Sequence, residues 1–246
     1  MRESLEVKRR TLGDTHPSTL SSINNLGMLL SDQGKLNEAE PLFREALEMR
    51  CRTLGETHRA TLKSVNNLAM LLQDQGKLDE AELLYREALE AQRRTLGDTH
   101  PDTLTSINNL ASLLQDQGKL SEAEPLYREA LEGSRRTLGD THPSTLMSIN
   151  NLAWLLEAQG KLSEAEPLCR EAVSGAKKTL SDAHPDTLNS VNNLASFLET
   201  QGKLDEAEPL YREAVSGAKK NLGDAHPLTV TFQKNLNVLL QKMGNV

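Results

Sequence analysis

The chain has 246 residues, of which 37% are hydrophobic, 26% are charged and only 3% are aromatic, and its formal net charge is -7. This acidic balance argues against general nucleic-acid binding, which relies on a basic surface. No stretch approaches the roughly 18 apolar residues of a membrane span, and the N-terminal MRESLEVKRR lacks the apolar run of a signal peptide. Two cysteines give no disulfide framework, so we expect a cytoplasmic protein.

One motif recurs every 42 residues along the chain. It reads RTLGDTHP or a close variant, and it begins at Arg10, Arg52, Arg94, Arg136, Lys178 and Lys220. All six histidines fall in this motif. A fixed period of this length predicts one array of repeats across residues 1–246. We divide it into half a helix B (1–12), repeats 13–54, 55–96, 97–138, 139–180 and 181–222, and a C-terminal capping helix (223–246).

Each repeat begins with a helix that we name helix A. In the first repeat Pro17 suits the first helical position, which needs no N–H. Apolar residues then follow with a helical period up to Leu30, and Gly34 provides a C-cap.

The second helix of each repeat, helix B, is predicted to begin at Asn37. Asn37 and Glu40 have the spacing of a capping box, and the later repeats keep this spacing. Pro41 then falls in the first turn, and the helix ends near Leu54 and Gly55. Each helix should contain about 17 residues, or roughly 25 Å of length.

The spacing of the apolar residues carries a family resemblance. Ile23-x2-Leu26-Gly27-x2-Leu30, followed by Ala39-x3-Phe43, fits the tetratricopeptide signature. With 42-residue units and the segments NNLA, QGKL and LYREALE, the chain resembles the tetratricopeptide array of the kinesin light chain family. The resemblance implies an all-α solenoid, a right-handed superhelix of antiparallel helix pairs. It also implies a protein–protein interaction scaffold or adaptor without catalysis or cofactor.

The two ends of the array differ. Residues 3–12 match the last half of a helix B, so we expect the natural array to continue before Met1. In the last helix A, Gln233, Lys234 and Lys242 replace apolar, asparagine and acidic residues of the earlier repeats. Such polar substitutions suit a solvent-facing cap.

Catalytic and metal sites are not predicted. The histidines occur once per repeat, and helix-packing distances of about 8–10 Å exceed what two ligands of one zinc ion allow. Cys169 stands where other repeats have Phe43, Tyr85 or Tyr127, so we interpret it as a core residue. We therefore expect no enzyme, no metal and no cofactor.

Helix A also carries a pair of asparagines in five repeats, although asparagine is a poor helix former. In a tetratricopeptide array helix A lines the concave face, and amides there pair with the backbone of an extended peptide. The resemblance thus implies a groove formed by Asn24, Asn66, Met70, Asn108, Asn109, Asn150, Asn151, Trp154, Asn192 and Asn193. The alternative is a structural bridge between neighbouring helices, because the second asparagine persists as Asn235 in the capping helix.

The charges of this groove predict the kind of partner. Lys63 is its one cation, whereas Asp32, Asp74 and Asp116 recur at the end of helix A. We therefore expect a neutral or basic segment of a partner protein, and no nucleic acid or membrane. Two other functions are compatible with the array: an architectural spacer or sensor arm of a larger signalling or motor complex, or a self-associating array. The chain would be a monomer or associate weakly end to end.

Overall fold

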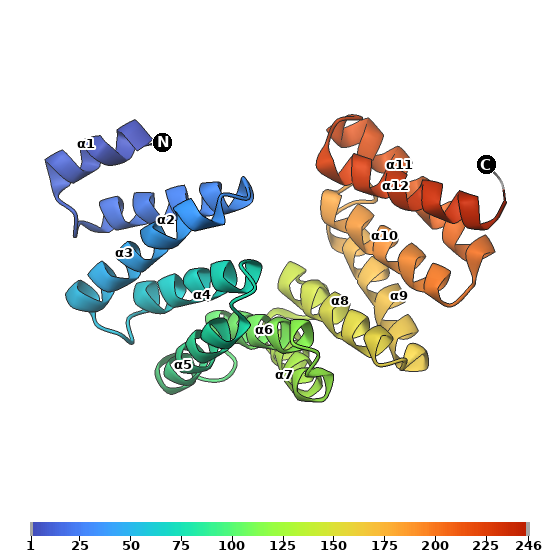
Figure 1. The fold of residues 1–246 in the computed structure, drawn as a ribbon. Coiled ribbons are helices and arrows are strands. Elements are labelled where there is room, and N and C mark those ends of the chain that lie inside the picture. The colour runs from blue at the N-terminus through green and yellow to red at the C-terminus, as the bar shows by residue number, and fades with distance from the viewer. Residues whose placement is uncertain (1, 245–246) are drawn as a thin grey trace. The chain divides into compact units, whose positions relative to one another are not determined.

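The computed structural model describes residues 2–244, and these contain helices and no strand (Figure 1). Met1, Asn245 and Val246, which fall in the predicted half helix B and capping helix, lie outside the described residues. In chain order the helices are α1 (Arg2–Leu12), α2 (Pro17–Asp32), α3 (Leu36–Leu54), α4 (Arg59–Asp74), α5 (Leu78–Leu96), α6 (Pro101–Asp116), α7 (Leu120–Leu138), α8 (Pro143–Ala158), α9 (Leu162–Thr179), α10 (Pro185–Thr200), α11 (Leu204–Leu222) and α12 (Pro227–Lys242).

The chain divides into two compact units, unit 1 (1–119) and unit 2 (120–246). Within each unit, helices that follow one another in sequence pack together, and the A helices of neighbouring repeats also touch, as α2 touches α4 and α8 touches α10. The predicted all-α solenoid of antiparallel helix pairs is confirmed (Figure 1).

The A helices begin where the sequence predicts. Each is 16 residues long and has a histidine as its N-cap. His16 Nδ1 accepts a hydrogen bond of 3.2 Å from the Ser18 amide, and the other five histidines make the equivalent bond. The bond satisfies one of the orphan amides of the first turn. The recurring histidine therefore caps a helix.

A glycine with a left-handed backbone conformation follows each A helix. In α2 the φ of Gly34 is 73°, and the Lys35 amide donates to the Leu30 carbonyl over 2.9 Å. This is the Schellman arrangement, which L-residues adopt only with strain. The glycine turns the chain back so that helix B can pack against helix A.

The predicted capping box of helix B is wrong. The helix begins one residue earlier, at Leu36, and Lys35 at the N-cap makes no side-chain cap bond. Since Asn37 already lies inside the helix, its amide cannot cap it, and Pro41 is the sixth helical residue rather than a first-turn residue. Helix B is also longer than predicted, with 19 residues in α3 and 18 in α9.

The core of a repeat lies between its two helices. Ile23 and Phe43 expose 0% and 1% of their surface. A Cβ atom on Gly27 would stand 3.1 Å from the Phe43 ring, and this close approach explains why the first five A helices have only glycine or alanine at this position. Such close contact makes each helix pair rigid enough to hold side chains of helix A in fixed places.

Candidate functional site on the A-helix face

The first asparagine of each pair lies deeper than a simple groove contact requires. Asn24, Asn108 and Asn192 expose only 6%, 6% and 7% of their surface, and Asn66 and Asn150 are partly buried. Of the second asparagines, Asn25 is exposed, and Asn67, Asn109, Asn151 and Asn193 are partly buried. The pairs thus lie at the junction between A helices and the surface.

Several asparagines link neighbouring A helices. Asn67 Nδ2 donates to Asn24 Oδ1 over 2.9 Å, and Asn235 Nδ2 donates to Asn192 Oδ1 over 3.1 Å. Asn66 Nδ2 donates to Ser106 Oγ over 2.7 Å. These bonds match the bridging alternative, and ligand contact by the asparagines stays a prediction.

In unit 2 a depression of about 530 Å³ lies between α8 and α10, with the end of α9 below it. We call it the α8/α10 depression. Met147 and Trp154, from α8, each expose 48% of their surface, which is unusual for side chains of this size. The depression is lined by Pro143, Ser144, Leu146, Met147, Asn150, Asn151, Trp154, Ala176, Leu180, Asp186, Asn189, Ser190 and Asn193. It combines an apolar wall with a row of amides.

Asp186 is the one charged residue of this lining. Its side chain is 64% exposed, and the nearest basic group is His184, whose Nδ1 lies 3.7 Å from Oδ2. That Nδ1 accepts a hydrogen bond from the Asp186 amide and so does not donate to the Asp186 carboxylate. Among the described residues no lysine or arginine lies within ion-pair distance of Asp186. Asp186 therefore has no lysine or arginine partner in the part of the chain that the structure describes.

Unit 1 has a depression at the same place in its repeats, between α4 and α6, of about 630 Å³. We call it the α4/α6 depression. Lys63 stands at the position of Met147, and Arg59 at the position of Pro143. Arg59 Nη2 lies 3.1 Å from Asp102 Oδ1, and Nε contacts the other oxygen. The hydrogen bond from Arg59 holds the pKa of Asp102 below its ordinary value.

Met70, also predicted to line the groove, is exposed on α4 but does not line the α4/α6 depression. Trp154, which stands at the position of Met70 two repeats later, does line the α8/α10 depression. The lining of unit 1 is instead polar and charged: His58, Arg59, Ala60, Lys63, Asn66, Asn67, Gln92, Asp102, Thr105 and Asn109.

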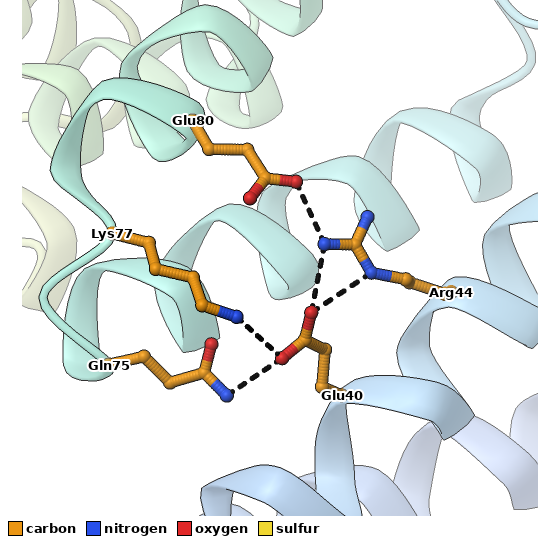
Figure 2. Close-up of polar contacts among 5 residues, drawn as sticks. All are labelled: Glu40, Arg44, Gln75, Lys77 and Glu80. Atoms are coloured by element: carbon orange, nitrogen blue, oxygen red, sulfur yellow. Dashed lines mark hydrogen bonds and ion pairs between the residues drawn. The ribbon is translucent and has the colours of Figure 1, made fainter.

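A cluster of ion pairs fixes one repeat on the next. Glu40 accepts hydrogen bonds of 2.9 Å from Arg44 Nη2, Gln75 Nε2 and Lys77 Nζ, and Arg44 continues to Glu80 over 2.8 Å (Figure 2). The bond from Lys77 is the largest of several that lower the pKa of Glu40 to about 2. We call this arrangement the glutamate clamp. It recurs at Glu82, Glu124 and Glu166, each also with a pKa of about 2.

The clamp was missed in the sequence, where Glu40 was interpreted as a helix cap. A signal was present, because QGKL follows each of the first five A helices and, for the last four of these segments, a glutamate stands 37 residues before the lysine. The clamp lies at the other end of helix A from its histidine cap. It therefore fixes the spacing of A helices without taking part in the depressions.

Other chemistry-bearing residues have structural places. Burial raises the pKa of the Cys169 thiol to about 12, so the thiolate nucleophile is scarce at neutral pH. Over residues 2–244 no group of three or more His, Cys, Asp or Glu side chains is arranged to hold a metal ion. No helix in that range is both long and apolar enough to cross a membrane.

Family models described as tetratricopeptide repeat match residues 19–60, 58–135, 105–178 and 187–228. The chain belongs to the tetratricopeptide repeat family. The repeat is a protein-interaction fold, so this tetratricopeptide protein has the architecture of an interaction scaffold. No curated protein sequence matches it.

Solved structures point to the kinesin light chain type within this family. A Podosopora anserina protein, described as kinesin light chain with nearly identical TPR-like repeats, is 31% identical with a TM-score of 0.69. The alignment covers 84% of this chain and 98% of that one. BtubC (BKLC) from P. vanneervenii is 25% identical with a TM-score of 0.74, over 92% and 91% of the two chains.

A more distant structure shares the fold alone. It is a Rap protein complexed with Competence and Sporulation Factor, 14% identical with a TM-score of 0.72. The alignment covers 99% of this chain and 72% of the Rap protein.

Proposed function

We propose that this tetratricopeptide protein is a scaffold or adaptor that binds an extended segment of a partner protein on its A-helix faces, without catalysis. The observation that carries the proposal is the α8/α10 depression, where two large apolar side chains stay half exposed on a rigid helix pair. Exposed aromatic side chains in a concave site are typical anchors of protein interfaces.

The row of amides supports an extended ligand. Asn150, Asn151, Asn189 and Asn193 line the depression on both sides. An amide offers both donors and an acceptor, as an extended backbone does, so a strand-like segment would satisfy both partners. The asparagines that bridge A helices would hold their neighbours in place for this contact.

Charge supports a neutral or basic segment. In the α8/α10 depression the lining holds the Asp186 carboxylate and no lysine or arginine. An acidic segment would bring like charges together in a site that offers no compensation.

The test is a comparison of two variants that import residues from other repeats of the same chain. Trp154→Ser places the residue of Ser112 and Ser196 in α8, so the fold should persist. Truncating a half-exposed anchor costs about 2 kcal/mol of binding, or roughly thirtyfold in Kd. Proteins captured from a lysate by the wild-type chain and identified by mass spectrometry should be lost by this variant.

The control removes an exposed apolar residue elsewhere. Leu83 of α5 is replaced by proline in Leu83→Pro, which is the residue at Pro41, Pro125, Pro167 and Pro209. This variant should retain every partner. If both variants capture the same proteins as the wild type, the A-helix face is not the binding site, and a spacer or self-associating array becomes the better account.

A further inference from the structure

We infer that the α8/α10 depression selects a partner segment in which a large apolar side chain lies next to a lysine or arginine. The inference rests on the proposed function and names the class of ligand for that site. It follows from comparing the two depressions residue by residue.

The basic part of the ligand is inferred from Asp186. In unit 1 the equivalent carboxylate, Asp102, is paired with Arg59, the first residue of α4. In unit 2 the first residue of α8 is Pro143, which offers no charge and no N–H. The chain thus supplies a cation for one carboxylate and not for the other, and a cation from the partner would take the place that Arg59 has in unit 1.

The apolar part of the ligand is inferred from α8. Met147 and Trp154 are seven residues apart, which places them on one face about 10 Å apart along the helix. Ala176 of α9 and Leu180, the residue that follows α9, complete the apolar lining below them. At the position of Met147 unit 1 carries Lys63, so this apolar wall belongs to unit 2 alone.

The two parts lie close enough for one short segment. In the repeat alignment Asp186 corresponds to Ser144, which is one helical turn before Met147. Asp186 lies on α10 and Met147 on α8, so the spacing of packed helices, about 8–10 Å, also separates them. Residues of an extended chain advance about 3.3 Å each, so two or three residues together with the length of a lysine side chain span this distance. A leucine with a lysine beside it would meet the apolar wall and the carboxylate together.

The test uses Trp154, the only tryptophan of the chain, as a fluorescent reporter inside the site. The probes are three acetylated and amidated peptides, Gly-Ser-X-Leu-X-Leu-X-Ser-Gly, in which X is lysine, glutamine or glutamate. A fourth peptide keeps X as lysine and replaces both leucines by serine. Each is titrated into the full chain at low salt.

We expect the lysine peptide to shift Trp154 emission and to bind about fivefold or more tightly than the glutamate peptide, as one partly exposed ion pair permits. The serine peptide should not shift the emission. In Pro143→Arg, which imports the residue of Arg59, the lysine peptide should bind no better than the glutamine peptide. The control Pro143→Gln, of similar length without charge, should keep the difference.

The outcomes separate the two proposals. Equal binding of the lysine and glutamate peptides, or an unchanged preference in Pro143→Arg, overturns the inference and leaves peptide binding intact. Binding of none of the peptides overturns both. Because Arg59 begins α4 without a proline, Pro143→Arg should fold. Asp186→Asn tests the same pair from the other side and should likewise remove the lysine preference.

Discussion

In the α4/α6 depression the carboxylate of Asp102 is paired with Arg59, whereas in the α8/α10 depression Asp186 stands at the same place in the repeat without such a partner. Around these carboxylates the two sites share their asparagines and their histidine-capped helices. They differ where Lys63 and Arg59 are replaced by Met147 and Pro143. The same repeated backbone therefore presents a charged site in one unit and an apolar, acidic site in the other. A few surface substitutions make the difference.

The two depressions can be compared because the helix pairs beneath them pack in the same way. A substitution in the core of a helix pair should disturb this packing most. Tyr85 of α5 is 1% exposed, and its counterpart in α9 is Cys169. Tyr85→Cys would leave a cavity under α4, so we expect a loss of about 3 kcal/mol in the free energy of unfolding. Urea denaturation followed by circular dichroism measures the loss.

The matched control is Tyr85→Phe, which imports the residue of Phe43 and should cost under about 1 kcal/mol. If Tyr85→Cys lowers the free energy of unfolding no more than Tyr85→Phe does, the helix pair of unit 1 closes around the smaller side chain, and the cores of the two units pack differently.

Acid should weaken the clamps of both units alike. Glu40, Glu82, Glu124 and Glu166 have pKa values of about 2 when folded, against an ordinary 4.5. A lowered pKa means that the folded chain binds these protons less readily than the unfolded chain. The stability they provide is therefore complete above pH 4.5 and is lost as the pH falls towards 2.

Because the lysine and arginine partners are about half exposed, we expect each clamp to contribute about 1 kcal/mol. Urea denaturation at pH 6 and pH 3 measures the total loss. Glu40→Gln, compared with Glu166→Gln, should reduce the pH dependence by the same share in either unit. A pH dependence unaffected by both substitutions would show that other carboxylates are responsible.

The smallest effect concerns the charged site alone. Arg59→Pro imports the residue of Pro143 and removes the hydrogen bond that most lowers the pKa of Asp102. The pKa of Asp102 should therefore rise in this variant. Lys63→Met imports the residue of Met147 and should raise it less, since Lys63 is the weakest of the groups that lower it. NMR titration of the carboxyl carbon distinguishes the two, and an equal rise would contradict the assignment of Arg59 as the main partner.

Much of the fold could be predicted because each signal lies within a few residues. The histidines before helix A, the glycine turns after it and the small residue that packs against the helix B core, such as Gly27 against Phe43, all follow from local spacing. Helix B was placed one residue late because Asn37 and Glu40 fit a local capping motif while Glu40 is engaged 37 residues away. Competition between a local and a distant partner is not visible in a single repeat.

The site could be predicted less well. Asparagine in a helix indicates a special role, yet the same amide can bridge helices or contact a ligand. Burial decides between these roles residue by residue, and it depends on how the next repeat packs. The contrast between Arg59 and Pro143 was present in the sequence, but its meaning required Asp102 and Asp186 to be placed beside them.

The glutamate clamp has a consequence for how such a chain can change in length. Each clamp joins a glutamate to a lysine 37 residues later, and the same lysine recurs every 42 residues. Deletion of one whole period after Glu40 would bring Lys119 to the position of Lys77, with its glutamine beside it. The gene can therefore gain or lose complete periods by recombination between its near-identical segments, and each new junction would carry a complete set of bonding partners.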